Sequence, residues 1–178
     1  IDLRITVSQD TGEGNDTLTS IERIFLYGSG DDTVYGNSES NYLSGGNGND
    51  TLYGYEGNDY LNGGNGIDVM EGGEGNDYYY VTTSSDTVTE DPSKGTDIVL
   101  SLAPTFTLSS NVENLTLYGS SDIDGVGNEL ANTIRGNSGN NELSGGDGTD
   151  NLYGNNGDDT LYGGNNNDIL YGLSLIHI

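Results

Sequence analysis

The sequence predicts an all-β protein built as a stack of short repeated coils. A nine-residue frame is seen in full at residues 45–53 and continues in register from residues 54, 63 and 72. A fixed short period indicates one structural unit stacked on itself. No segment has a helical hydrophobic period, and the 30 glycines of the chain would be costly in helices.

Position eight of the frame predicts a buried apolar stripe. No charged residue enters this column, although most other positions are polar or glycine. Its members are Val34, Leu43, Leu52, Leu61, Met70, Tyr79, Ile134, Leu143, Leu152, Leu161 and Leu170. We expect positions seven to nine to form a strand of about three residues whose middle side chain points into a narrow core.

Position six predicts a column of oxygen ligands. Its members are Asp32, Asn41, Asp50, Asp59, Asp68, Asp77, Asn132, Asn141, Asp150, Asp159 and Asp168. Two frames make one coil with a turn on each side, so turns two frames apart should stack on the same edge. The expected ligand pairs, each 18 residues apart, are Asp32 with Asp50, Asp50 with Asp68, Asp59 with Asp77, Asp150 with Asp168, Asn41 with Asp59, Asn141 with Asp159, and Asn132 with Asp150.

Glycines at positions one, two and four predict tight turns that direct backbone carbonyls toward these side chains. The glycines assigned to this role are Gly45, Gly46, Gly48, Gly63, Gly64, Gly66, Gly145, Gly146 and Gly148. Carboxylates and carbonyls together form a flexible cage of oxygen atoms, which suits Ca²⁺. Mg²⁺ prefers tighter octahedral geometry, and zinc or copper would favour histidine or cysteine. The predicted cofactor is therefore Ca²⁺.

The composition makes folding without cations unfavourable. The chain has 29 acidic and 4 basic residues, a net charge of -25, and 31% hydrophobic residues, which alone would predict disorder. Bound cations would remove the repulsion between carboxylates, so we expect folding to depend on calcium. The charge argues against nucleic acid and anionic membrane surfaces as partners. No apolar run is long enough to cross a bilayer.

The pattern G-G-x-G-x-D-x-U-x resembles the calcium-binding repeat of RTX, or hemolysin-type, proteins. A stricter signature of that family, which spans three frames, fits residues 50–68 and again residues 150–168. The resemblance implies a right-handed parallel β-roll, a form of β-solenoid, with calcium held between its turns. It also implies export of the unfolded chain by the type I secretion machinery of Gram-negative bacteria, and thus an extracellular location, either secreted or at the cell surface.

The chain departs from the family pattern at a few turns. Tyr55 and Asn155 occupy the place of the second glycine, and Asn166 that of the third. Asparagine tolerates left-handed backbone geometry better than tyrosine does. Asparagine also replaces the position-six aspartate at residues 41, 132 and 141, so these turns carry less charge.

A longer repeat contains the frame, because residues 21–29 align with residues 112–120 at an offset of 91 residues. The expected organisation is a set of apolar lead-in strands over 1–26, a first calcium-binding array over 27–80, a β-strand spacer or cap over 81–126, a second array over 127–172 and a non-native tail over 173–178. Spacer strands are expected over 97–102, 105–108 and 115–118. Since residue 1 is not methionine, the chain is expected to be an internal fragment.

The sequence favours a structural module over an enzyme. It has no cysteine, no Gly-x-Ser-x-Gly or His-Glu-x-x-His motif, and its one histidine, His177, lies in the expected tail. We interpret the chain as a calcium-binding structural and secretion module that folds on Ca²⁺ after type I export. The 91-residue repeat favours an adhesin-like repetitive exoprotein. The alternative is the C-terminal module of a secreted lipase, protease or hemolysin, which a catalytic motif upstream would support.

Other interpretations explain the repeats less well. An acidic low-complexity linker would have no reason to maintain an apolar column. Paired carboxylates suit glycosidase chemistry, but those of the frame are assigned to cations. Some repeats of the RTX type present an ice-binding threonine ladder from position three, which here carries Asn47, Glu56, Asn65 and Glu74 instead.

Overall fold

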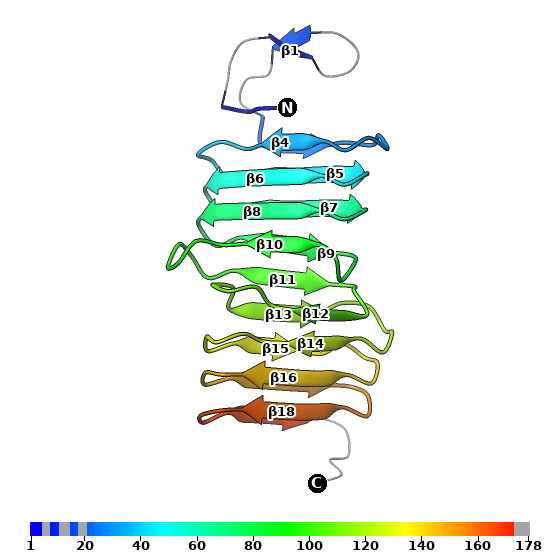
Figure 1. Ribbon diagram of the computed structural model, residues 1–178, viewed down its shortest axis with the longest axis vertical. Helices are drawn as coiled ribbons and strands as arrows, with labels where there is room; N and C mark the ends of the chain where they lie inside the picture. The colour runs from blue at the N-terminus through cyan, green and yellow to red at the C-terminus, as the bar shows by residue number, and fades with distance from the viewer. Residues whose placement is uncertain (5–7, 11–14, 18–20, 173–178) are drawn as a thin grey trace. The chain divides into compact units, whose positions relative to one another are not determined.

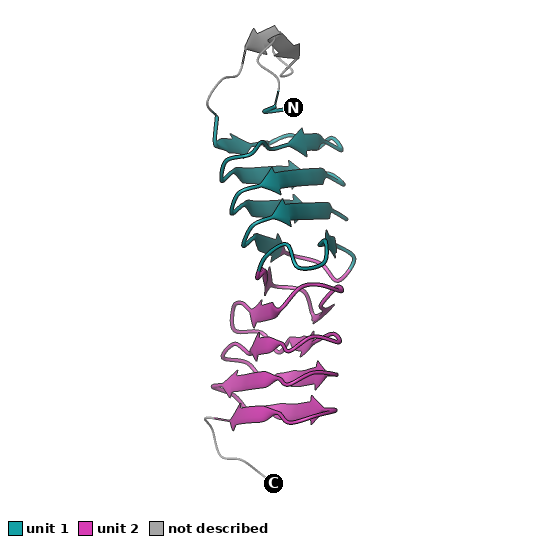
Figure 2. Cartoon of the chain, turned by 90° about the vertical axis from the view of Figure 1, so that its left-hand side faces the viewer, with its two compact units in different colours: residues 1–80, 85–95 teal, residues 81–84, 96–178 magenta. Residues whose placement is uncertain are grey.

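A computed structural model describes residues 1–4, 8–10, 15–17 and 21–172. All regular secondary structure of these residues is β-strand. None of them forms a helix that is long and apolar enough to span a membrane. The chain separates into two compact units, residues 1–80 with 85–95 and residues 81–84 with 96–178 (Figure 2).

Unit 1 places consecutive strands alternately in two parallel sheets (Figure 1). One sheet contains β4 (Thr33–Tyr35), β6 (Thr51–Glu56), β8 (Val69–Glu74) and β10 (Thr87–Thr89). The other contains β3 (Arg23–Phe25), β5 (Tyr42–Asn47), β7 (Tyr60–Asn65) and β9 (Tyr78–Val81). Each coil therefore contributes one strand to each sheet, which confirms the prediction of an all-β parallel solenoid.

Unit 2 repeats this arrangement. One sheet contains β11 (Ile98–Ser101), β13 (Asn114–Leu117), β15 (Thr133–Arg135), β17 (Asn151–Asn155) and β19 (Ile169–Gly172). The other contains β12 (Thr105–Thr107), β14 (Asp124–Val126), β16 (Glu142–Gly146) and β18 (Thr160–Gly164). The strands β11, β12 and β13 lie where spacer strands are expected.

The stacking register is the 18-residue coil. Leu43 pairs with Leu61 and Leu52 with Met70, so equivalent frame positions lie directly above one another. In unit 2, Leu143 pairs with Leu161 in the same way. The register thus turns two sequence columns into two ladders, one of apolar side chains inside and one of position-six side chains at the turns.

In the repeat arrays, each nine-residue frame contributes one large apolar side chain to the core. The position-eight residues from Val34 to Tyr79 are fully buried, as are Ile134, Leu143 and Leu152. Leu161 is half-buried and Leu170 is exposed, unlike the rest of the column. A column residue is covered by the coils on both of its sides, and β18 and β19 are the last described strands of unit 2. The apolar column is therefore confirmed except at Leu161 and Leu170.

Strands β5, β6, β7 and β8 of the first array are longer than the three residues expected. β6 spans six residues and continues through the first positions of the next frame. The ladder between β5 and β7 likewise extends to Gly46 opposite Gly64 and Asn47 opposite Asn65. The small residues at these positions let neighbouring coils approach closely enough for the pairing to continue.

The lead-in over 1–26 is described only in part. β1 (Ser8–Asp10) pairs antiparallel with β2 (Asn15–Thr17). Asp2 bridges Tyr35 in parallel, and the Arg4 guanidinium lies 4.7 Å from the ring centroids of both Tyr35 and Tyr55. Residues 5–7, 11–14, 18–20 and the predicted tail over 173–178 lie outside the described residues.

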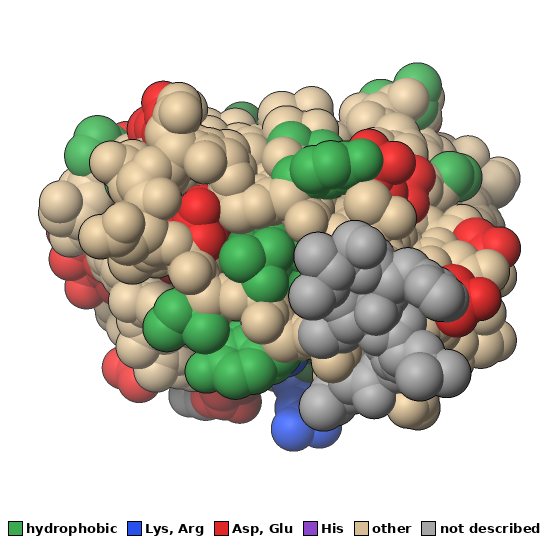
Figure 3. Space-filling model, turned by 90° about the horizontal axis from the view of Figure 1, so that it is seen from below, with side chains coloured by type: hydrophobic (Ala, Val, Ile, Leu, Met, Phe, Trp, Pro, Cys, Tyr) green, Lys and Arg blue, Asp and Glu red, His purple; other side chains and the backbone are tan. Residues whose placement is uncertain are grey.

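Hydrophobic side chains are exposed where unit 2 ends its described strands. Figure 3 shows this face, on which hydrophobic groups lie among backbone atoms and scattered acidic side chains. Ile169, Leu170 and Tyr171 of β19 are all exposed.

We expect Leu61→Ala to destabilise the folded chain by about 2–5 kcal/mol, because it removes a fully buried side chain from a core with no second layer. The measurement is denaturant unfolding at saturating calcium. The matched control is Ile67→Ala on the same coil, where the side chain is exposed and a change within about 0.5 kcal/mol is expected. Equal effects of the two substitutions would contradict the assignment of the core.

Candidate metal centre

Position-six residues lie directly before the strands, at the turns of the coils. The backbone N–H of one such residue donates to Oδ1 of the carboxylate 18 residues later, at 2.8 Å for Asp50 to Asp68 and 2.7 Å for Asp59 to Asp77. The same bond joins Asp32 to Asp50, Asn41 to Asp59, Asn132 to Asp150, Asn141 to Asp159 and Asp150 to Asp168. The structure therefore brings together all the predicted pairs.

The second carboxylate oxygen turns back over the position-one glycine of its own turn. A Cβ on Gly54 would collide with Oδ2 of Asp59 and with the carbonyl oxygen of Gly72 from the next coil. A Cβ on Gly145 would likewise collide with Oδ2 of Asp150 and the carbonyl oxygen of Gly163. A carboxylate oxygen and a carbonyl oxygen thus converge on a space that exists because position one has no side chain.

These inner carboxylate oxygens have no hydrogen-bond donor. The buried Oδ2 atoms of Asp50, Asp59, Asp68, Asp150 and Asp159 lack a hydrogen-bond partner. The side chains of Asp50, Asp59, Asp68 and Asp150 are at most 1% exposed. Burying a carboxylate without a positive partner is expensive, so such an atom indicates a place where a cation can bind. Oxygen atoms alone line the space, which fits Ca²⁺.

Electrostatics agree with the geometry. Burial raises the pKa of Asp59 to about 7, and the carboxylate of Asp77 adds to the shift. Burial also raises the pKa of Asp68 to about 6, with further contributions from Asp86 and Asp50. The pKa of Asp150 is raised by the same cause, with Asp168 contributing. Without a cation, the stacked carboxylates resist ionisation.

The asparagine turns are closed by hydrogen bonds. The amide of Asn132 donates to the carbonyl oxygens of Val112 and Glu113, both at 3.2 Å, while its Oδ1 accepts from the N–H of Asn128. The amide of Asn141 donates to the carbonyl of Ile123 at 2.6 Å. An asparagine N–H therefore takes over part of the role that a cation has beside aspartate, and these turns need less added charge.

Different frame positions require glycine for different physical reasons. Positions two and four have left-handed backbone angles, with φ of 99° at Gly46 and 122° at Gly48. Gly64, Gly66, Gly146 and Gly148 share this conformation, as do Tyr55, Asn155 and Asn166 at the departures from the pattern. Gly45, Gly63 and Gly145, at position one, do not. At position one, glycine is needed to leave room for the carboxylate of its own turn, and not for a left-handed backbone angle.

Acidic residues outside the strict frame, namely Asp86, Asp97 and Glu113, extend the position-six column. Asp86, before β10, accepts from the N–H of Asp68 at 3.2 Å. Glu113, before β13, accepts from the N–H of Asp97 at 2.8 Å across 16 residues. The 18-residue offset from Asp68 predicts Asp86 once it is applied beyond residue 80. Glu113 does not follow this offset, because the coil between Asp97 and Glu113 is two residues shorter. The longer glutamate side chain reaches the Asp97 N–H in spite of that difference.

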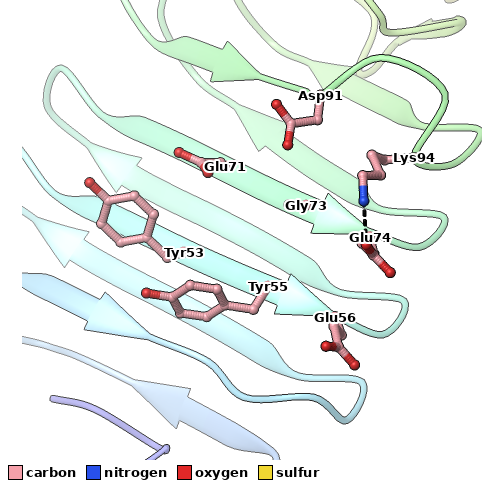
Figure 4. A pocket seen from close by; sticks show the side chains of 9 residues that line it. Tyr53, Tyr55, Glu56, Glu71, Gly73, Glu74, Asp91 and Lys94 are labelled. Atoms are coloured by element: carbon pink, nitrogen blue, oxygen red, sulfur yellow. Dashed lines mark hydrogen bonds and ion pairs between the residues drawn. The ribbon is translucent and has the colours of Figure 1, made fainter.

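A separate pocket of about 240 Å³ lies on the outer face of β6 and β8 (Figure 4). It is lined by Tyr53, Tyr55, Glu56, Glu71, Gly72, Gly73, Glu74, Asp91 and Lys94. Lys94 forms an ion pair with Glu74, and the acidic side chains of this pocket are all exposed. Water solvates these carboxylates, so the pocket lacks the buried negative charge of the turns.

Buried carboxylates that stack at the turns of a parallel β-roll are typical of a cation-binding β-solenoid. A family model for the RTX calcium-binding nonapeptide repeat matches the chain in four copies, over residues 27–61, 53–88, 126–161 and 144–174. The matches cover more than half of the chain, and the chain belongs to the RTX calcium-binding repeat family. Repeats of this family bind Ca²⁺ and occur in secreted proteins. Neither a curated protein nor a solved structure matches the chain.

Calcium binding should weaken as the pH falls. With a folded-state pKa of about 7 against an ordinary 3.8, protonated Asp59 stabilises the metal-free fold below about pH 4, and this contribution is lost as the pH rises toward 7. Calcium requires the ionised carboxylate, so the calcium midpoint should rise on the order of tenfold between about pH 7.5 and 5.5. Calcium titrations followed by circular dichroism at both values measure this. A midpoint that does not change with pH would contradict the burial of these groups.

Adding a methyl group at position one should remove a calcium ion. In Gly54→Ala the new Cβ would occupy the space shared by Asp59 Oδ2 and the Gly72 carbonyl. Equilibrium dialysis should find about one fewer calcium ion per chain. Gly30→Ala is the control, because a Cβ there meets no atom within 4 Å. If both variants bind as much calcium as the unsubstituted chain, the ion does not lie over the position-one glycine.

Proposed function

We propose that this chain is a calcium-dependent folding and secretion module of a larger extracellular bacterial protein. In this proposal the chain is exported unfolded by a type I secretion system and folds when it meets calcium outside the cell. Family membership supports calcium binding and an origin among secreted proteins. The role in folding is argued from the charges and contacts of this chain.

The observation that carries the proposal is the ladder of buried carboxylate oxygens without donors. Each stacked coil adds a buried negative charge to a chain whose net charge is already -25. The core that must offset this repulsion receives one large apolar side chain from each frame of the arrays. A cation at each turn converts repulsion between coils into attraction to a shared ion.

The calcium ligands in this proposal are the position-six side chains and nearby glycine carbonyls. Asp50, Asp59, Asp68, Asp77, Asp150, Asp159 and Asp168 would supply the charged oxygens. Asp32 belongs to the same ladder through its bond to Asp50. Asn41, Asn132 and Asn141 would contribute less, because their amides already form hydrogen bonds.

The calcium affinity of the repeats can make folding depend on whether the chain is inside or outside the cell. Extracellular calcium modules bind at roughly 10⁻⁴ to 10⁻³ M, well above cytosolic calcium. At about ten times its dissociation constant, each site adds on the order of 1.4 kcal/mol. Several sites together match the stability of a domain, about 5–15 kcal/mol. Such a chain would remain unfolded before export and fold afterwards.

The parent protein in this proposal is an adhesin-like repetitive exoprotein. The 91-residue repeat is the supporting observation, and its lead-in segments correspond in the two units. β3 precedes the first array and buries Ile24, while β13 precedes the second and buries Leu115. Repetition of lead-in and array together favours a tandem architecture over a single module that ends a secreted enzyme or toxin.

Circular dichroism during a calcium titration tests the proposal, with chelator and Mg²⁺ as controls. We expect a coil-like spectrum in chelator and a cooperative gain of β signal at submillimolar to millimolar calcium. Asp59→Ala should raise the midpoint, because Asp59 belongs to the pairs with Asn41 and with Asp77.

The matched control for Asp59→Ala is Asp91→Ala, which removes an exposed carboxylate from the same unit. Its midpoint should stay at the value of the unsubstituted chain. A full β signal in excess chelator would refute calcium-dependent folding.

A further inference from the structure

A short ladder of tyrosine rings on the outer face of unit 1 stops at the pocket of Figure 4. The ring of Tyr35 stacks on that of Tyr53, with centroids 5.2 Å apart and planes 7° from parallel. On the next coil, the residue paired with Tyr53 is Glu71, so the ladder has no third ring. Tyr55 lies beside Tyr53, and the residue paired with it is Gly73, which has no side chain. The pocket therefore has tyrosine rings on one side and the glycine backbone of β8 on the other.

Tyr55 occupies a turn position that favours glycine. Its φ is 82°, in the left-handed region, and the same frame position on neighbouring coils holds Gly46, Gly64 and Gly73. A bulky side chain is uncommon in this region because its Cβ is crowded. The backbone therefore disfavours tyrosine at this turn, and what the residue adds is a ring on the outer face.

The chain places one of its own guanidinium groups on this ring. The Arg4 guanidinium lies 4.7 Å from the ring centroids of both Tyr35 and Tyr55. Its Nη1 donates to the Tyr55 hydroxyl at 2.6 Å. Its Nε and Nη2 donate to the two carboxylate oxygens of Asp2, at 2.8 and 2.6 Å. Tyrosine rings and a carboxylate together thus hold an arginine, through cation–π and bidentate contacts.

Unit 2 shows the same combination on its own tyrosine ladder. The rings of Tyr153 and Tyr171 stack with centroids 4.7 Å apart. The residue paired with Tyr153 on the preceding coil is Arg135, whose guanidinium lies 5.0 Å from the Tyr153 centroid. An arginine therefore covers one end of a tyrosine ladder in each unit.

The pocket offers these parts at the other end of the ladder of unit 1. Arg4 lies on the β4 side of Tyr55, where it also contacts Tyr35, whereas the pocket lies on the β8 side. Carboxylates of Glu71 and Asp91 line it, as Asp2 flanks Arg4 (Figure 4). The pocket thus has the aromatic and acidic groups that hold Arg4.

The charge of the pocket favours a cation. Four carboxylates, those of Glu56, Glu71, Glu74 and Asp91, line it together with the one ammonium of Lys94. The ion pairs of the described residues are Arg4 with Asp2 and Lys94 with Glu74, so Glu71 and Asp91 have no basic partner among them. The hydrogen bond to Glu74 raises the pKa of Lys94, and the charges of Asp91 and Glu56 add to the shift. Negative charge therefore remains in the pocket after Lys94 is counted.

We propose that this pocket binds an arginine side chain from a basic segment of a partner protein. Tyr53 and Tyr55 contact the guanidinium plane, and Glu71 and Asp91 accept its N–H groups. A planar guanidinium stacks on aromatic rings and donates in a fixed fork, which an ammonium group cannot do. Phosphate groups and acidic chains are repelled by the excess of carboxylates. The site uses none of the position-six side chains, so it is a function additional to calcium binding.

A tripeptide with one guanidinium tests the site on the folded 178-residue chain at saturating calcium. The probe is acetyl-Gly-Arg-Gly-amide, titrated at about 0.15 M salt to screen attraction to distant charges. We expect saturable NMR shifts of the backbone amides of Tyr55, Gly73 and Lys94. The same peptide with citrulline, which is neutral, should give no shifts, and the peptide with lysine should bind more weakly.

Substitutions locate the binding energy. Tyr55→Gly restores the residue that the turn favours and should weaken binding about two- to fivefold, as loss of an exposed cation–π contact does. Glu71→Gln should weaken it by a similar factor. Lys94→Gln should strengthen binding, because it removes the competing ammonium. The matched control is Glu22→Gln, which removes an exposed carboxylate of unit 1 outside the pocket and should leave the affinity unchanged.

The outcomes separate this site from the calcium sites. A chain that binds calcium but shows no saturable shifts with the arginine peptide refutes this inference and leaves the proposed function intact. Equal binding of the citrulline peptide, or shifts spread over the acidic surface, would also refute it. Should Tyr55→Gly fail to fold, the comparison of Glu71→Gln with Glu22→Gln decides. Equal affinities of those two variants would show that the peptide responds only to net charge.

Discussion

The rest of this β-roll depends on a carboxylate oxygen packed against a glycine that leaves room for it. Because position one has no side chain, the aspartate five residues later can turn back over its own turn and face the carbonyl of the next coil. Its other oxygen accepts the N–H of the position-six residue one coil earlier. The same side chain therefore ties two coils together and leaves a negative charge between them. The packing that sets the register therefore also buries a charge that a bound cation would balance.

Because the apolar core is small, the stability of the fold can depend on bound cations. Each frame contributes one apolar side chain, and each coil contacts chiefly the coils beside it, so stability accumulates coil by coil. Such a stack has little apolar surface with which to overcome a net charge of -25. In the proposed function, metal binding replaces part of the stabilisation that a larger hydrophobic core gives an ordinary domain. A fold stabilised in this way can respond to the calcium concentration of its surroundings.

The exceptions to the repeat follow the same physical rule. Asn132 and Asn141 provide N–H donors where aspartate would need a cation, so their turns close through hydrogen bonds to the preceding coil. Tyr79 extends a hydroxyl from the core and donates a hydrogen bond to the buried Glu90, which lies outside the nine-residue frame. In both cases the oxygen atoms between coils receive a partner, although the chemical means differ. The repeat therefore tolerates changes of residue type better than changes in how this charge is balanced.

The sequence by itself determined the period, the apolar column, the 18-residue pairing and the calcium chemistry. A nine-residue frame has one column of large apolar side chains to point inward, and its aspartates recur at one position of the turn. Tertiary structure decided what lies outside that periodicity. Asp86 and Glu113 take positions in the carboxylate column, and Glu90 reaches Asp77, because of how the chain bends after the strict frame ends. Only the packed coils distinguish the glycines of position one, which admit a carboxylate, from those of positions two and four, which need left-handed backbone angles. Local spacing encodes contacts that repeat along the chain, whereas a contact made once depends on the three-dimensional path of the backbone.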